Sequence, residues 1–268
     1  MFGSLAPARR RLVLTLLAAL VLVAGLLTAL VVRTAVGRSS VRPVAQAVAG
    51  PVLLLPGYGG STTGLTVLAQ RLRAAGKDVT VVNLPDQAQG DLAGQALTLA
   101  QAVKAVVRRT GSPSVDVVGY SAGGVVARLW AKRYDGDRLA RRVITLGSPQ
   151  HGTALAALGS LLAGECPLAC QQLISTSPLL AQLNARPEVP PGPAFVSFWT
   201  SHDQVVLPPE SAELVGALNI EIQSVCPTSA VDHTGLPTDP LVARMVTAEL
   251  TGPAVVSLGA GDCARLSG

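Results

Sequence analysis

The chain has 268 residues, of which 49% are hydrophobic and only 14% are charged, a composition that excludes an intrinsically disordered protein. Its formal net charge is +5, but six of the 21 basic residues and none of the 16 acidic residues lie in residues 1–42. The rest of the chain therefore carries 15 basic and 16 acidic side chains, and aromatic residues are only 3% of the whole. Without a basic surface or stacking aromatics, nucleic-acid binding is not expected.

The first feature in chain order is an uncharged run, residues 12–32, which follows a basic tail at residues 1–11. A helix of this length is roughly 30 Å long, close to the thickness of the bilayer core. The run is longer than the apolar stretch of a secretory signal, and the nearest small-residue cleavage sites, within residues 45–49, lie well beyond it. We therefore expect a single-pass transmembrane anchor at residues 12–32 and a linker at residues 33–50. A cleaved signal of a secreted protein is the alternative.

The cysteines bear on the compartment. They are four in number and lack the paired C-x-x-C spacing of a zinc site: Cys166, Cys170, Cys226 and Cys263. An even set beyond a membrane signal is typical of two disulfides in an oxidising compartment, so we expect the domain on the extracytoplasmic side. Of the three possible pairings we favour Cys166 with Cys170 and Cys226 with Cys263, because both close local loops. Four unpaired core thiols are the alternative.

Strand and helix patterns alternate through the remainder, residues 51–268. Continuous apolar runs and β-branched segments predict strands at 52–55, 79–82, 115–118, 143–146, 194–200 and 220–225. Helical spacing and end signals predict helices at 65–75, 91–109, 122–133 and 240–250. Asp91 is expected in the first turn of its helix, and Asp239 is expected as an N-cap with Pro240 after it. This alternation predicts one α/β domain, a mostly parallel sheet covered by helices on both faces.

A G-x-S-x-G motif lies at residues 119–123, between the strand that ends near Val118 and the helix that begins at Ala122. This strand–turn–helix setting is the one that a nucleophile elbow requires. The flanking glycines allow a turn so tight that Ser121 would be strained and exposed, with the positive end of the helix near it. Ser121 is therefore the candidate nucleophile, and an ordinary glycine-rich turn is the alternative.

Acyl transfer also needs hydrogen-bond donors for the oxyanion. One donor would be the backbone N–H of Ala122, directly after the nucleophile, and the other should come from the loop after the first strand. That loop is Pro56-Gly57-Tyr58-Gly59-Gly60, and we choose the N–H of Tyr58. The loop lacks the Gly-Lys-Ser/Thr ending that a phosphate-binding loop would have.

The general base is sought among three histidines, His151, His202 and His233. Where an elbow carries the serine, the acid and then the histidine follow it in chain order. Asp203 follows a predicted strand, and His233 lies in the next loop before the last helix, so these two are the candidate acid and base. Asp232 adjoins His233 and is expected to serve the loop, whereas Asp116 comes too early in the chain. His151 and His202 are expected to be ordinary loop histidines.

Together these segments resemble the compact bacterial lipases and esterases of the α/β-hydrolase superfamily, close to the class 2 lipases. The resemblance covers about residues 51–250 and rests on the segments 56–60, 119–124, 146–153, 201–203 and 232–233. It implies a minimal α/β-hydrolase fold without the two antiparallel strands of larger relatives, and the triad Ser121, Asp203 and His233. Many relatives have His-Gly where Pro56-Gly57 stands and His-Ser where Tyr120-Ser121 stands, which leaves backbone donors intact but puts close substrate preference in doubt.

Residues 152–193 are longer than the corresponding segment of the smallest relatives. Leucines at helical spacing, Leu155, Leu158, Leu161 and Leu162, predict either core packing or a lid-like wall over Ser121 that is clipped by the short disulfide. The resulting hypothesis is a serine carboxylic-ester hydrolase of lipid or other acyl esters that needs no metal or organic cofactor. An acyltransferase of envelope lipids with the same triad, and a catalytically silent membrane-anchored binding module, are the alternatives. The sequence leaves the oligomeric state open.

Overall fold

The computed structural model describes residues 7–38, 41–162 and 166–268 and divides into two units, residues 1–41 and 42–268. The first unit contains helix α1 (Pro7–Arg38), in which the uncharged run lies. No helix among the described residues is long and apolar enough to cross a membrane. The membrane span predicted at residues 12–32 thus has no support from them. Residues 1–6 of the predicted tail and residues 39–40 of the predicted linker lie outside the described residues.

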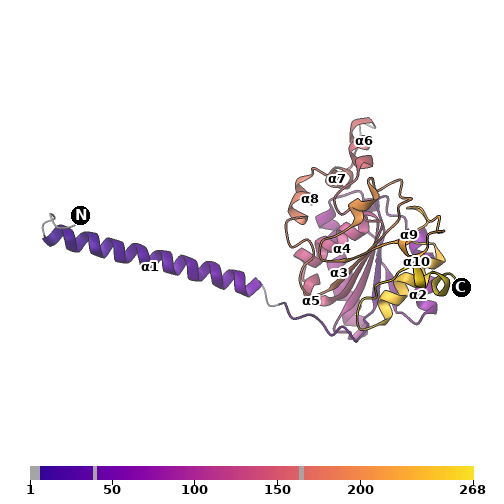
Figure 1. Cartoon of the computed structure of the whole chain (residues 1–268), viewed down its shortest axis with the longest axis horizontal. Helices are drawn as coiled ribbons and strands as arrows, with labels where there is room; N and C mark the ends of the chain where they lie inside the picture. The colour runs from indigo at the N-terminus through magenta and orange to yellow at the C-terminus, as the bar shows by residue number, and fades with distance from the viewer. Residues whose placement is uncertain (1–6, 39–40, 163–165) are drawn as a thin grey trace. The chain divides into compact units, whose positions relative to one another are not determined.

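The second unit is built on a six-stranded sheet with the order β2-β1-β3-β4-β5-β6, in which each pair of neighbouring strands is parallel (Figure 1). The strands are β1 (Val52–Leu55), β2 (Val79–Val81), β3 (Val115–Tyr120), β4 (Ala140–Leu146), β5 (Ala194–Trp199) and β6 (Leu218–Glu221). Because the strands are parallel, their carboxyl ends all meet at one edge of the sheet. The loops that follow β1, β3 and β5 therefore lie at that edge.

Helices cover both faces of the sheet, as the alternating pattern predicts. The long ones are α2 (Thr63–Ala74), α3 (Leu92–Thr110), α4 (Ala122–Arg133) and α10 (Pro240–Thr251). The buried side chains form two apolar clusters: Leu53 and Val117 face α3 and α4, whereas Leu54 and Val118 face α2 and α10. This period of two along each strand gives the sheet an apolar layer on both sides, and each large side chain buried there contributes about 1.5–3 kcal/mol.

Two helix starts follow their sequence signals. Asp239 caps α10 as predicted, since its Oδ1 accepts hydrogen bonds from the N–H groups of Leu241 (2.7 Å) and Val242 (3.1 Å). Asp91 is not in the first turn of α3; it is the N-cap, and its carboxylate accepts a hydrogen bond from the N–H of Gly94. Both carboxylates satisfy amides that have no partner within the helix.

The predicted strand at residues 220–225 is wrong in its second half. β6 ends at Glu221, and Ile222–Val225 forms a helical turn, α9, in which Ile222 and Val225 are both buried. A spacing of three residues places two side chains on one face of a helical turn but on opposite faces of a strand, and only the helical turn buries both on the same side.

Shorter helices complete the unit. They are α5 (Gly136–Leu139), α6 (Ala154–Leu162), α7 (Leu168–Gln172), α8 (Pro178–Leu183), α11 (Cys263–Ser267), and the 3-10 helices η1 (Pro85–Ala88), η2 (Pro209–Ala212) and η3 (Ala260–Asp262). The predicted insertion, residues 152–193, contains α6, α7 and α8, and its residues 163–165 lie outside the described residues.

Candidate active site

The G-x-S-x-G motif forms a sharp turn between β3 and α4. Ser121 has φ 53° and ψ −128°, a backbone conformation that costs a non-glycine residue of order 1–3 kcal/mol. Its N–H donates to the carbonyl of Leu146 on the next strand at 2.8 Å, which holds the turn against β4. A Cβ on Gly123 would lie 2.5 Å from the carbonyl oxygen of Pro56, so only glycine lets α4 approach the end of β1 this closely.

Ser121 differs from its predicted state in one respect. The turn is strained as expected, but the residue is only 9% exposed instead of standing open to solvent. The loop after β1 covers it: a Cβ on Gly57 would lie 2.7 Å from the Cβ of Ser121. The close approach of Gly57 thus accounts for the low exposure of Ser121.

The structure brings Ser121, His233 and Asp203 together in one hydrogen-bonded row. The distance from Ser121 Oγ to His233 Nε2 is 3.0 Å, and the distance from His233 Nδ1 to Asp203 Oδ2 is 2.7 Å. His233 and Asp203 are each only 4% exposed. Residues 112 and 30 positions apart in the sequence from His233 therefore meet at the carboxyl edge of the sheet within hydrogen-bonding distance.

The loop after β5 orients the carboxylate of Asp203. Its Oδ1 accepts hydrogen bonds from the N–H groups of Val205 (2.8 Å) and Val206 (2.7 Å), which leaves Oδ2 for His233. A carboxylate that bonds amides two and three residues ahead is a familiar turn of aspartate. These two amides were not predicted from the sequence, where the only signal for them is an aspartate that follows a strand.

The other candidate acids and histidines lie apart from this row. Asp232 is exposed and accepts hydrogen bonds from Gly235 N–H and the Thr234 hydroxyl, and the amide of Gly235 is the first cause that holds its pKa below the usual range. Asp116 forms a buried ion pair with Arg141 (2.5 Å), and burial raises the pKa of its carboxyl. The two remaining histidines do not join the row either. His202 is exposed, and Nε2 of His151 lies 3.4 Å from the carboxylate of Glu188.

An apolar pocket of about 270 Å³ opens beside the serine. Its lining combines Ser121, Tyr58 and Pro149 with residues of the insertion and of the loop after Asp203: Thr153, Leu155, Ala156, Gly159, Cys170, Leu173, Val205 and Val206. Leu155 and Leu158 of α6 are 43% and 49% exposed, so these two described leucines of the stripe are not core residues. The side chains of Leu161 and Leu162 lie outside the description. The insertion is thus a wall of the pocket.

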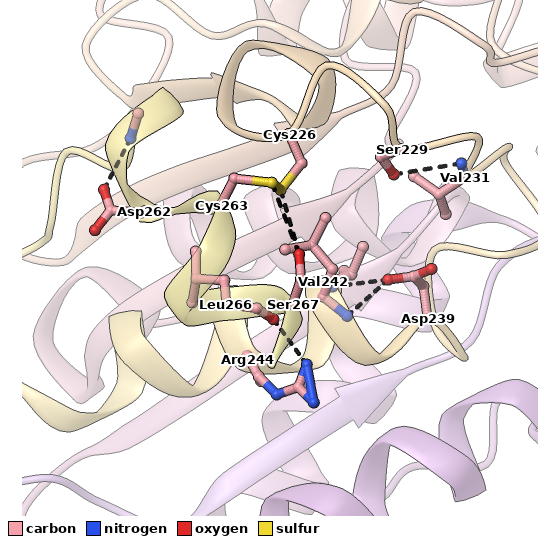
Figure 2. Close-up of a disulfide and its surroundings, with 12 residues drawn as sticks. Cys226, Ser229, Val231, Asp239, Val242, Arg244, Asp262, Cys263, Leu266 and Ser267 are labelled. Atoms are coloured by element: carbon pink, nitrogen blue, oxygen red, sulfur yellow. Dashed lines mark hydrogen bonds between the residues drawn. A yellow bond between two sulfur atoms is a disulfide. The ribbon is translucent and has the colours of Figure 1, made fainter.

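Both predicted cysteine pairs are present as disulfides. Cys166–Cys170 clips the start of α7, where Cys170 lines the pocket. Cys226–Cys263 joins the residue after α9 to the first residue of α11, as Figure 2 shows. The chain after α10 is partly helical, with Leu266 buried against the core and its carbonyl oxygen accepting a hydrogen bond from Arg244 at 2.7 Å.

The Cys226–Cys263 disulfide gives a prediction on stability. It closes a loop with a sequence separation of 37, which corresponds to about 4 kcal/mol in the loop-entropy description. We expect Cys226→Ser/Cys263→Ser to lower Tm by several degrees and to reduce activity at temperatures below that Tm, because the loop that leads to His233 begins at Cys226. Thermal denaturation with parallel activity assays measures both effects.

The matched control is Cys166→Ser/Cys170→Ser, whose disulfide spans a separation of only four residues and is worth about 2 kcal/mol by the same relation. A Tm loss in this control equal to that of the first variant would contradict the argument. So would a non-reducing peptide map in which Cys226 is linked to Cys166 or Cys170.

Comparison with known proteins places the fold. The family described as alpha/beta hydrolase fold matches residues 50–164. Lipase B of Aspergillus fumigatus is similar in structure, with 22% identity and a TM-score of 0.69 over 82% of this chain and 55% of that chain. The mature form of the Bacillus licheniformis lipase BlEst2 has 19% identity and a TM-score of 0.60 over 74% of this chain and 89% of that chain.

The propeptide form of the same Bacillus lipase matches 82% of this chain with a TM-score of 0.66. No curated protein matches the sequence. The chain spans 55% of the length of the Aspergillus lipase and 53% of the propeptide form. At these identities the likeness concerns the fold: the chain has the α/β-hydrolase fold, and the resemblance to α/β-hydrolases found in the sequence is confirmed.

Proposed function

We propose that the protein is a serine carboxylic-ester hydrolase of the lipase and esterase type. The observation that carries the proposal is the row Ser121–His233–Asp203 at the end of an apolar pocket. Such a row serves nucleophilic acyl transfer, because the histidine takes the serine proton and the aspartate fixes the imidazole. The fold and the lipases that share it support the same class of chemistry.

The reaction begins with attack of Ser121 Oγ on the ester carbonyl. His233 Nε2 accepts the serine proton and passes it to the leaving alcohol, and the resulting acyl-enzyme is hydrolysed by a water that His233 activates in turn. Asp203 Oδ2 accepts a hydrogen bond from the Nδ1–H group of His233 and stabilises the imidazolium that forms. The strained backbone turn at Ser121 places its side chain in position for attack before the substrate arrives.

The oxyanion of the tetrahedral intermediate would be bound by the backbone N–H groups of Tyr58 and Ala122. Ala122 is the first residue of α4, whose early amides lack partners within the helix. Tyr58 lines the same pocket as Ser121, and Gly57 beside it lets the loop come close to the serine. Each such donor is worth about 3–4 kcal/mol in the transition state.

The test of this proposal is a panel of p-nitrophenyl esters from acetate to palmitate, assayed with the purified chain. We expect saturable hydrolysis that a fluorophosphonate abolishes, because the reagent reacts with an activated serine. The absence of both hydrolysis and labelling would favour a binding module. Product esters formed on addition of an acceptor alcohol, in place of free acid, would favour an acyltransferase.

The pocket predicts the preferred acyl chain. The pocket is small, about 270 Å³, and its lining is mostly apolar, so we expect a short to medium acyl chain to fit best, with the highest kcat/KM near octanoate. Gly159 of α6 lines the pocket, and a Cβ there would meet no atom closer than Cys170 Sγ at 4.0 Å, so a larger side chain fits at this position and would take up pocket space. Gly159→Phe should lower kcat/KM for octanoate more than tenfold and spare butyrate.

The control is Gly159→Ala, whose Cβ makes an ordinary contact and should leave the profile within about twofold of wild type. Chain-length profiles of the three proteins on p-nitrophenyl esters give the result. An equal loss on butyrate and octanoate would mean that the phenylalanine damages the fold, and an unchanged profile would remove this pocket from acyl binding.

We also propose that the catalytic domain works on the extracytoplasmic side, either anchored or secreted. The two disulfides support an oxidising compartment, and the uncharged residues 12–32 would provide the export signal. Protease added to intact cells should digest a retained domain and spare a cytoplasmic marker, and a secreted domain should appear in the medium. A new N-terminus beyond residue 40 would identify cleavage, and a domain released only by lysis would contradict the proposal.

A further inference from the structure

His233 lies on a long loop that needs external support. Between α9 and α10 the chain runs through residues 226–239 without a described helix or strand. A general base must be held to within about half an ångström of its productive position. The contacts of this loop with the sheet edge therefore determine how well His233 is placed.

Tyr120 provides such a contact from the end of β3. Its hydroxyl donates to the backbone carbonyl of His233 at 3.1 Å, and its ring centroid lies 5.2 Å from the imidazole centroid with the planes inclined by 39°. Tyr120 directly precedes Ser121 and pairs in register with Leu146 on β4. The strand end that carries the nucleophile is thus bonded to the residue that carries the base.

The phenol of Tyr120 stays protonated near neutral pH and so remains a hydrogen-bond donor. Burial, followed by the negative charges of Asp203 and Asp232, raises the pKa of this tyrosine to about 12. The residue is not among those that line the apolar pocket. Tyr120 is therefore not part of the pocket assigned to the acyl chain.

A second anchor lies on the other side of the loop. Thr200, fully buried after β5, donates its hydroxyl to the carbonyl of Val231 at 2.7 Å and accepts a hydrogen bond from Gln223 Nε2 at 3.0 Å. Because this anchor holds Val231, loss of the Tyr120 hydroxyl should release His233 locally without unfolding the loop.

We propose that Tyr120 is a positioning residue for His233, its hydroxyl fixing the backbone of the base relative to Ser121. The proposal rests on the esterase function proposed above. Tyr120 occupies the variable position of the G-x-S-x-G motif before the serine. A phenylalanine there would have the same shape but could not form the hydrogen bond to the carbonyl of His233.

The test compares Tyr120→Phe with Tyr134→Phe, a tyrosine after α4 that is outside the site. For Tyr120→Phe we expect kcat to fall about 3- to 10-fold, as for one lost hydrogen bond, with KM for a p-nitrophenyl ester unchanged and Tm within a few degrees of wild type. Tyr134→Phe should match wild type in kcat and KM. An unchanged kcat, or a raised KM with normal kcat, would overturn the proposal.

A second measurement does not depend on activity. The proton shared by His233 Nδ1 and Asp203 gives a low-field proton NMR resonance, which we expect to shift or broaden in Tyr120→Phe but not in Tyr134→Phe. An identical resonance in the three proteins would overturn the proposal even if kcat changed. If the wild type hydrolyses no ester, the proposed function fails, and the resonance still decides the role of Tyr120.

Discussion

Replacing Ser121 with alanine should lower kcat for ester hydrolysis by about 10⁴- to 10⁶-fold. The methyl group cannot form the acyl-enzyme, so only binding and the oxyanion donors would remain to assist water. The hydroxyl of Ser121 lies 3.0 Å from His233 Nε2, and no other side chain among the described residues is hydrogen-bonded to that nitrogen. His233→Ala should cause a loss of the same order, because the residues of a triad act as a unit.

Covalent labelling separates this loss from simple damage to the fold. A fluorophosphonate should label the wild type at one site and leave Ser121→Ala unlabelled, with both proteins equally stable. Ser224→Ala removes an exposed hydroxyl of α9, bonded only to the carbonyl of Glu221, and should keep both activity and labelling. Labelling that persists in Ser121→Ala would exclude this serine as the nucleophile.

The fold was largely predictable because parallel strands carry a strong signal. Leu53 and Leu54 point to opposite faces of the sheet and are both fully buried, so the continuous apolar run of β1 follows directly from its two-sided burial. The elbow was predictable because its motif glycines have a steric cause: a Cβ on Gly119 or on Gly123 would lie 2.5 Å from a backbone carbonyl oxygen.

The features that the sequence could not predict depend on contacts between distant segments. The burial of Ser121 results from the approach of Gly57, and the hydrogen bond of Tyr120 joins residues 113 positions apart. The pocket wall gives another case, since leucines at helical spacing fit a core helix as well as an exposed one. The exposed fraction of Leu155 and Leu158 in α6 depends on which segments pack nearby, and the spacing of leucines does not reveal those segments.

The prediction was wrong at residues 222–225 and gave no helix at Cys263–Ser267, both for a local reason. Short elements such as α9 and α11 contain four and five residues, too few for a periodic pattern to stand out from chance. Both are held by tertiary contacts instead, among them the disulfide between Cys226 and Cys263 and the buried side chain of Leu266 (Figure 2).

The two candidates for the catalytic acid, Asp203 and Asp232, should respond very differently to the same substitution. Asp203→Asn should lower kcat by about 10⁴-fold, whereas Asp232→Asn should stay within about threefold of wild type. Both changes replace one carboxylate oxygen by an NH₂ group and hardly alter volume. Asp232 is exposed and serves a turn through Oδ1, which an asparagine oxygen replaces directly.

The contacts of Asp203 explain why its substitution should be severe. Because the amides of Val205 and Val206 both donate to Oδ1, the oxygen of an asparagine would stay there and its NH₂ group would occupy the position of Oδ2. That NH₂ group would donate to His233 Nδ1 and force the proton of the imidazole onto Nε2. An Nε2 that already carries a proton cannot accept one from Ser121.

The measurements are kcat and the rate of fluorophosphonate labelling for the two variants, with Tm as the check on folding. Labelling should slow in parallel with kcat in Asp203→Asn, because both require the same proton transfer from Ser121. An active Asp203→Asn together with an inactive Asp232→Asn would reverse the assignment. Since the two substitutions are chemically identical, and Asp232 directly precedes the histidine that Asp203 contacts, a difference between them reports on which carboxylate holds Nδ1.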